Sequence, residues 1–211
     1  MVDVAIVDYG MGNLRSVEQA LRHVAPAADI VVTDDASVIA QAGRVVFPGQ
    51  GAMPDCMREL DARGLRNAVI DAAQTKPFLG ICIGLQMLFE HSAEGDVPGL
   101  GVLSGDVLRF AGGMQDAEGN KLKVPHMGWN QVRHQTDHPL WNGIAQDARF
   151  YYVHSYYVKP QDQSLIQATS DYPVPFVCAV ARGNLFGVQF HPEKSQAAGL
   201  KLLQNFIHWN P

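Results

Sequence analysis

One cysteine stands in a sequence context that favours nucleophilic chemistry. Cys82 follows a short apolar run and lies between Gly80 and Gly84, and an amphipathic stretch continues from Leu85 to Phe89. The spacing Gly-x-Cys-x-Gly is the cysteine version of a nucleophile elbow, a sharp strand-to-helix turn at which larger neighbours would clash. Such a turn exposes the sulfur at a helix N-terminus, where free N–H groups favour the thiolate. A buried, inert cysteine is the alternative, and the glycines alone do not exclude it.

A histidine and a glutamate near the C-terminus could activate that cysteine. Residues 185–190 have the composition of a strand, and His191, Pro192 and Glu193 follow directly. In an extended segment residues two apart point to the same side, so the Glu193 carboxylate can hold one nitrogen of His191. The other nitrogen is then free to face a nucleophile as a general base. We therefore predict Cys82, His191 and Glu193 as catalytic residues, with an ordinary loop His and Glu as the alternative.

Composition indicates a single domain over residues 1–211. A chain of 211 residues with 47% hydrophobic content can bury one large core, and its net charge of −5 argues against nucleic acid or an anionic membrane as a partner. Three widely spaced cysteines form neither a disulfide framework nor a zinc site, which fits a reducing cytosol. The longest apolar stretch is too short to span a bilayer. We expect a soluble, cytoplasmic protein whose partner is a protein or a small molecule.

The element pattern predicts an α/β fold with a doubly wound, mostly parallel sheet and an antiparallel extension. Predicted strands at 4–7, 31–32 and 45–47 and the strand that leads into the elbow alternate with helical segments at 14–24, capped by Asn13, and at 54–73. The second half is rich in β-formers at 150–158, 165–169, 176–181 and 185–190, with a hairpin turn at 182–184, a surface loop at 111–120 and a final helix at 196–208. The active site of such a sheet lies beyond the carboxyl ends of its strands, where the elbow places Cys82.

Several segments resemble a known family. Residues 80–86, the Pro-Gly-Gln-Gly segment 48–51 and residues 189–193 resemble class I (triad) glutamine amidotransferases. Three further segments, 8–16, 125–130 and 152–156, are similar to the glutaminase subunits of imidazole glycerol phosphate synthases. The resemblance runs from Val4 to about Ile207 and implies the flavodoxin-like fold of that family and a role in histidine biosynthesis. Gln50, Ile83 and Leu85 stand where the family often has other residues.

The resemblance also implies roles for individual residues. The Cys82 thiolate would attack the side-chain amide of glutamine, with His191 as general acid and base and Glu193 orienting its ring. Backbone N–H groups of an oxyanion hole would come from the residues Gly49, Gln50, Gly51 and Ile83. The glutamine pocket would include Gln86, Ser155 and Tyr156, although strand aromatics such as Tyr156 also commonly pack in a core. No cofactor or metal is implied.

The family delivers ammonia through a channel to a partner, a (β/α)8-barrel cyclase subunit. Nothing in this chain resembles that barrel, so we expect a heterodimer of two separate chains. The partner interface implied by the resemblance contains Asn13, Arg15, Pro125, Met127 and Trp129. Trp129 would be an interface anchor, and a buried core tryptophan is the competing interpretation.

Other functions are also compatible with parts of the sequence. Gly10-Met11-Gly12 after the first strand suggests a dinucleotide site, but Arg15 replaces the third glycine. A cysteine redox sensor or chaperone could use the same elbow, although it would not need the His191 and Glu193 pair. A glutaminase of pyridoxal phosphate or anthranilate synthesis would keep the chemistry and change the pathway. A metal site at His134 and His138 lacks an evident third ligand.

Overall fold

A twelve-stranded sheet forms the centre of the protein, and its parallel half is the doubly wound sheet predicted from the sequence. The structure is a computed structural model that describes residues 2–116 and 118–211. The parallel strands are β1 (Val4–Val7), β2 (Ile30–Thr33), β3 (Arg44–Gly49), β4 (Phe78–Cys82) and β14 (Leu185–Val188). They lie in the order β2-β1-β3-β4-β14. The carboxyl ends of β3, β4 and β14 are therefore neighbours, which brings residues 49, 82 and 189 to one edge.

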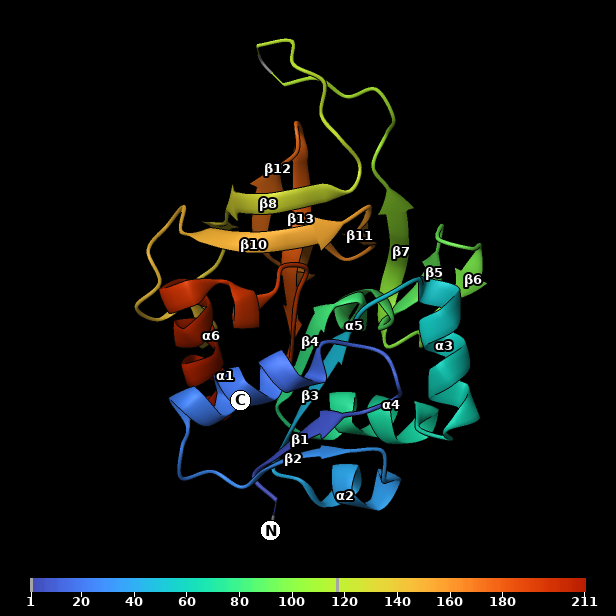
Figure 1. Cartoon of the computed structure of the whole chain (residues 1–211), viewed down its shortest axis with the longest axis vertical. Coiled ribbons are helices and arrows are strands. Elements are labelled where there is room, and N and C mark those ends of the chain that lie inside the picture. The colour runs from blue at the N-terminus through green and yellow to red at the C-terminus, as the bar shows by residue number, and fades with distance from the viewer. Residues whose placement is uncertain (1, 117) are drawn as a thin grey trace.

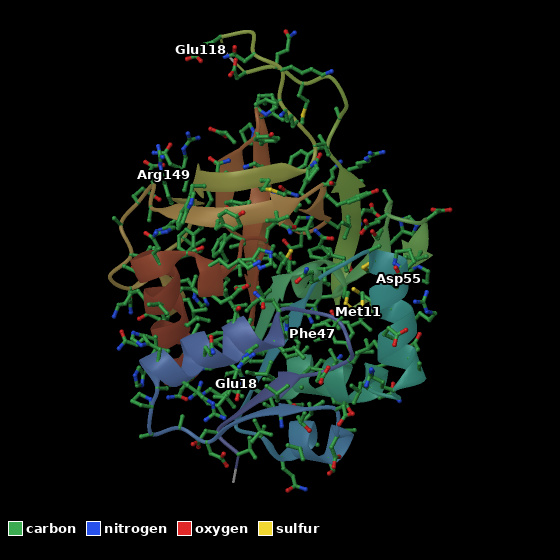
Figure 2. All side chains as sticks on the ribbon, in the orientation of Figure 1. Met11, Glu18, Phe47, Asp55, Glu118 and Arg149 are labelled. Carbon is green, nitrogen blue, oxygen red and sulfur yellow. The ribbon has the colours of Figure 1, made fainter. Side chains whose placement is uncertain are left out.

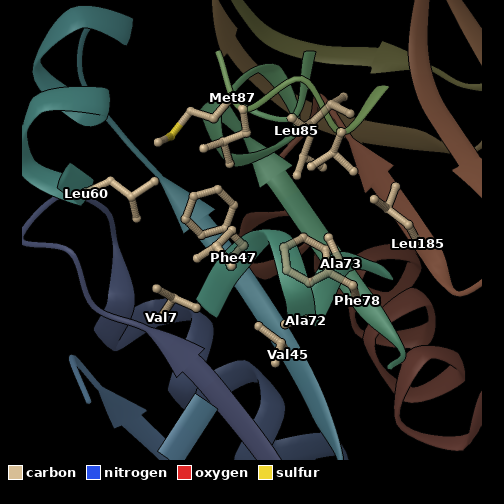
Figure 3. Close-up of a cluster of buried hydrophobic side chains, with 14 of the residues drawn as sticks. Val7, Val45, Phe47, Leu60, Ala72, Ala73, Phe78, Leu85, Met87 and Leu185 are labelled. Carbon is tan, nitrogen blue, oxygen red and sulfur yellow. The ribbon is translucent and has the colours of Figure 1, made fainter. Parts of the chain in front are cut away.

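Helices cover both faces of this half (Figure 1). One face carries α1 (Leu14–Val24) and α6 (Gln196–His208), and the other carries α2 (Ala36–Gln41), α3 (Met53–Ala62) and α4 (Arg66–Thr75). The strands are buried on both sides, so alternate residues of β1 enter two different cores. Figure 3 shows one of these cores, in which Val7, Val45 and Phe47 face Leu60 of α3.

The antiparallel extension predicted for the second half is also present. Its strands are β5 (Phe89–Ser92), β6 (Val97–Pro98), β7 (Leu103–Arg109), β9 (Arg133–His134), β11 (Tyr156–Pro160), β12 (Ile166–Asp171) and β13 (Pro175–Arg182). β13 joins β14 through the turn at Gly183 and Asn184, and the sheet continues as β14-β13-β11-β7-β5-β6. β5 and β7 pair in parallel, whereas the other contacts of this half are antiparallel.

A separate two-stranded ribbon lies next to α6 (Figure 1) and was not predicted from the sequence. It pairs β8 (His126–Gln131) with β10 (Arg149–His154). The β-rich segment 150–158 forms two strands, because the chain bends at Ser155 and leaves β10 to join the main sheet as β11. Residues 111–116 and 118–120 of the expected loop lie between β7 and β8, and Ala117 lies outside the described residues. Figure 2 shows Glu118 at the far end of this loop.

The segment 54–73 is helical, as expected, and it is divided into two helices because Gly64, with a φ of +67°, ends the first one near Ala62. The amphipathic stretch 85–89 is not one helix, since α5 covers only Ile83–Gln86 and Phe89 begins β5. Asn13 is the N-cap of α1 through its carbonyl, and within the described residues its side chain takes no part in that cap. In the described part of the chain, the helices fall short of the length and apolarity that crossing a membrane requires.

Candidate active site

A sharp strand-to-helix turn presents Cys82 at the edge of the sheet. Cys82 is the last residue of β4 and the N-cap of α5, with φ 57° and ψ −114°. A positive φ is strained for a residue with a Cβ, so the surrounding backbone must enforce it. A Cβ at Gly84 would overlap the carbonyl oxygen of Phe47, and one at Gly80 would lie 3.2 Å from the Leu85 backbone. The two glycines therefore let α5 pack directly on β3 and β4.

His191 and Glu193 form a buried pair beside this turn. His191 Nδ1 lies 2.9 Å from Glu193 Oε1, and the exposed fractions of the two side chains are 7% and 1%. The extended segment expected here is a 3₁₀ turn at Pro192–Lys194, so the turn and not strand alternation brings the two side chains together. Ser195 locks the turn, because its hydroxyl donates to the His191 carbonyl and accepts the Tyr151 N–H.

The electrostatics of the site favour a charged imidazole. Burial of His191 opposes its positive charge, but Cys82 and Glu193 outweigh burial and raise the pKa of His191 to about 10. An imidazolium beside a sulfur is what a thiolate–imidazolium pair requires. Burial raises the pKa of both Cys56 and Cys178 to about 11, so each of these is held as a neutral thiol.

Two buried glutamines connect the sulfur to the neighbouring strand. Gln189 is fully buried, and its Nε2 lies 3.8 Å from Cys82 Sγ. Gln86 Nε2 donates to Gln189 Oε1 at 2.9 Å and to the Tyr156 carbonyl at 3.1 Å. Gln86 was predicted from the resemblance, whereas Gln189 was missed. Its position directly after β14 and two residues before His191 was the signal that could have found it.

A pocket of about 240 Å³ opens over the sulfur. Its lining includes all the predicted oxyanion residues, all the predicted glutamine-pocket residues and two of the three predicted catalytic residues. These are Gly49, Gln50, Gly51 and Ile83; Gln86, Ser155 and Tyr156; and Cys82 and His191. Pro125, predicted at the interface, lies on its rim, and Glu193 supports His191 from behind. Two charged lining residues, Glu94 and Lys194, were missed by the sequence analysis. Glu94 comes from the segment after β5, about a dozen residues beyond the elbow, and no sequence pattern marks it.

Comparison with known proteins agrees with this geometry. Residues 5–209 match the family model described as glutamine amidotransferase class-I. The chain belongs to the class I glutamine amidotransferases. It is 65% identical to the imidazole glycerol phosphate synthase subunit HisH of Thiobacillus denitrificans, over 100% of this chain and 92% of the relative. It is also 65% identical to the HisH subunit of Aromatoleum aromaticum, with 100% of both chains covered.

Solved structures show the same fold at much lower identity. The structure of PurLQS from Thermotoga maritima superposes with a TM-score of 0.70 at 19% identity, and 98% of each chain is covered. The class I fold therefore persists where most side chains differ. Among the residues described in this amidotransferase, no group of three or more His, Cys, Asp or Glu is placed to hold a metal ion. His134 instead stacks on Trp141, and His138 packs against Phe186 and Trp209.

Most of the residues predicted at the partner interface are exposed, and one of them, Pro125, lines the pocket. Met127 is 62% exposed and Trp129 is 42% exposed, so Trp129 is not the core tryptophan of the competing interpretation. The Trp129 ring meets Tyr151 of β10 edge-on at 5.9 Å between centroids. Arg15 is exposed and Asn13 is half-buried at the start of α1. Tyr156 fits both the substrate-pocket and the core-packing interpretation, since it lines the pocket and also packs against the core.

Proposed function

We propose that residues 1–211 form one glutamine amidotransferase domain that hydrolyses glutamine to glutamate and ammonia. The chain would serve in the cytoplasm as the glutaminase subunit of imidazole glycerol phosphate synthase in histidine biosynthesis. The observation that carries this proposal is the His191–Glu193 pair held beside the elbow cysteine in one pocket. The 65% identity to HisH subunits along the whole chain supports the pathway.

Formation of the thioester is the first chemical step. The Cys82 thiolate attacks the side-chain amide carbon of glutamine, and the negative charge moves to the amide oxygen. Backbone N–H groups of Ile83 and of the segment 49–51, which line the pocket, would stabilise that oxyanion. As the C–N bond breaks, the His191 imidazolium gives its proton to the leaving nitrogen, and ammonia departs. The raised pKa of His191 fits this step because it keeps the proton on the ring until it is needed.

Hydrolysis of the thioester is the second step. His191, now neutral, removes a proton from a water molecule that attacks the thioester carbon. The C–S bond breaks, glutamate leaves, and the thiolate and imidazolium are restored. Glu193 holds Nδ1 throughout, so Nε2 is the nitrogen that faces the reacting atoms and carries the exchanged proton.

The charged rim of the pocket suits the free end of glutamine. Glu94 lines the pocket and is fixed by the Met53 N–H, which donates to its Oε2 at 2.9 Å. A fixed carboxylate is complementary to the α-ammonium group of a free amino acid. Gln86, Ser155 and Tyr156 would line the side-chain portion of the same substrate.

The ammonia would pass to a (β/α)8-barrel cyclase subunit in a heterodimer. Free ammonia in water becomes ammonium, which is not nucleophilic, so direct transfer through a channel protects it. The cyclase would use it on a phosphoribulosyl formimino aminoimidazole carboxamide ribonucleotide, giving imidazole glycerol phosphate and an aminoimidazole carboxamide ribonucleotide. The exposed Met127 and Trp129 lie on the strand beside the pocket and suit a docking surface.

Glutamate release from glutamine tests this proposal. The purified chain is assayed alone, then with the cyclase subunit, and then with the cyclase and its nucleotide ligand. We expect hydrolysis that appears or rises strongly only in the full mixture. Hydrolysis that ignores the cyclase would move the chain to another pathway, and no hydrolysis under any condition would favour the redox-sensor alternative.

A further inference from the structure

Two buried histidines face each other across the β8–β10 ribbon, next to the pocket. His126 and His154 are directly opposite in the strand register and are 4% and 6% exposed. Their rings meet through His126 Nδ1 and His154 Nε2 at 2.8 Å. The His126 ring is also stacked on Tyr152 and on Tyr172, with centroids at 5.0 Å and 4.0 Å. Neither histidine has a part in the chemistry described above.

The partners of this pair fix the position of every proton. The Tyr156 carbonyl can only accept, so His154 Nδ1, 2.8 Å away, must carry a hydrogen. A neutral imidazole has one N–H, so His154 Nε2 is an acceptor and takes the N–H of His126 Nδ1. His126 Nε2 is then an acceptor as well. Burial lowers the pKa of His126 to about 4 and that of His154 to about 3, which agrees with neutral rings.

Asn130 fixes the direction in which hydrogens are donated along this series of hydrogen bonds. Its amide nitrogen lies 3.3 Å from His126 Nε2 and 2.8 Å from the Asp171 carbonyl, so its two hydrogens have two acceptors. Its oxygen accepts the Gln131 N–H at 2.8 Å. Each donor therefore meets an acceptor from Asn130 through both histidines to the Tyr156 carbonyl, and the order cannot be reversed. A fully satisfied buried network of this kind is rigid.

The chain of hydrogen bonds ends at the pocket. The Tyr156 carbonyl that His154 holds also accepts from Gln86, which binds Gln189, whose amide nitrogen faces Cys82 Sγ. Tyr156, Gln86 and His154 all line the pocket. The histidine pair thus braces the wall of the pocket where the proposed substrate would lie, from a ribbon outside the main sheet.

We propose that His126 and His154 are positioning residues, a neutral pair with both hydrogens on Nδ1 that holds the Tyr156 carbonyl and Gln86 in place for glutamine. The claim that the pair serves glutamine binding rests on the proposed function, whereas the protonation and hydrogen bonding of the two histidines do not. The two are therefore tested by separate measurements.

The tautomers are measured first, on the wild-type chain alone and in complex with the cyclase subunit. Nitrogen-15 NMR of histidine-labelled protein at pH 7 should show two neutral rings protonated at Nδ1, assigned by their loss in His126→Asn and His154→Asn. Protonation at Nε2, or a charged ring, at either residue would overturn the proposal. This result does not depend on any activity.

The kinetic test compares His154→Phe, which removes the donor, with His154→Asn, which keeps an N–H near the position of Nδ1. In the presence of cyclase and ligand, His154→Phe should lower kcat/KM for glutamine roughly tenfold, mainly through KM, because this is the net contribution of a typical hydrogen bond. His154→Asn keeps the donor and should stay within about threefold of wild type. His138→Phe, a half-buried histidine packed on aromatic rings away from the pocket, should match wild type.

Three outcomes would overturn the proposal: a folded His154→Phe with unchanged kcat/KM, equal losses in the Phe and Asn variants, or the same loss in His138→Phe. If His154→Phe does not fold, the Asn variant and the tautomers decide. A wild-type chain that releases no glutamate refutes the proposed function and leaves the NMR result to judge the pair.

Discussion

The elbow at Cys82 and the β8–β10 ribbon support the same pocket in different ways. At the elbow, the geometry comes from backbone packing: α5 lies against β3 and β4 because Gly84 has no Cβ to meet the Phe47 carbonyl. In the ribbon, it comes from side chains, with His126 and His154 joined across 28 positions of sequence. The elbow tolerates no added atom, whereas the ribbon depends on the placement of hydrogens.

This difference separates two kinds of failure. A change at the elbow moves backbone and should affect folding and chemistry together. A change in the ribbon removes hydrogen bonds while the strands stay paired, so it should affect substrate binding more than folding. Substitutions at the two sites can therefore show whether the elbow depends on backbone packing and the ribbon on side-chain hydrogen bonds.

The largest effect on activity is expected when the Cys82 sulfur is removed. Cys82→Ala should lower glutamine hydrolysis by at least roughly 10⁴-fold, because no covalent intermediate can form. Ammonia-dependent synthesis by the complex should survive, since the cyclase would receive ammonia from solution. Both activities are measured on the purified complex.

A matched control uses another buried cysteine. Cys178→Ala also removes a thiol, but from a fully buried core position that is not part of the pocket lining. It should retain glutamine hydrolysis. Loss of ammonia-dependent synthesis in Cys82→Ala with an intact complex, or equal losses in the two variants, would show that the role assigned to Cys82 is wrong.

The elbow geometry is tested by Gly84→Ala. The added Cβ overlaps a backbone carbonyl, which cannot move without shifting β3, so the free energy of unfolding should fall by about 3 kcal/mol or more. Urea unfolding measures this loss, and alkylation of Cys82 reports whether the sulfur is still presented. Gly112→Ala, where nothing lies within 4 Å of the new Cβ, should change stability by less than about 1 kcal/mol. Similar losses at both glycines would contradict the packing argument.

The sequence predicts the elbow at Cys82 far better than the β8–β10 ribbon. The parallel strands, the turn at Cys82 and the helix at 196–208 follow from local apolar runs and glycine spacing, and all are present. The ribbon was missed, because β8 contains no β-branched residue and no continuous apolar run, and a glycine lies at its centre. Ser155 looks like the middle of one strand in sequence, and only the pairing of β10 and β11 with different partners shows the break.

The residues of the pocket were also only partly predictable from the sequence. Gln86 and the segment 49–51 were placed there through the family resemblance, since their spacing alone indicates no substrate. Gln189 and Glu94 were missed because their roles depend on side chains from separate strands meeting in space. The 3₁₀ turn at Pro192 also brought His191 and Glu193 together by a route different from the one predicted.

Glu193→Gln tests whether the charge or only the hydrogen bond of this residue matters. The amide oxygen can still accept from Nδ1, but the negative charge that helps raise the pKa of His191 is lost. The rate constant kcat should fall roughly 10²-fold, since general acid–base catalysis contributes that much. NMR titration should show a lower pKa for His191 than the wild-type value of about 10.

The same variant should alter stability at alkaline pH. A raised pKa in the folded state stabilises the fold fully below the unfolded pKa near 6.5. That contribution is lost as pH rises through about 10. In Glu193→Gln the loss should occur at lower pH, as followed by urea unfolding between pH 7 and pH 10. Identical pH curves would mean that the Glu193 charge does not act on His191.

The smallest effect is expected for the ribbon at acid pH. His154 has a lowered pKa in the folded state, about 3, so its neutral form is favoured by folding and the unfolded chain binds more protons below pH 6.5. Wild-type stability should therefore fall as pH falls from 6.5 toward 3. His154→Asn has no titrating group at position 154. The difference between the two proteins in the free energy of unfolding should therefore shrink by on the order of 2 kcal/mol between pH 6.5 and 4.5. Urea unfolding across this range gives the answer, and parallel curves would mean that His154 is not held neutral by burial in the ribbon.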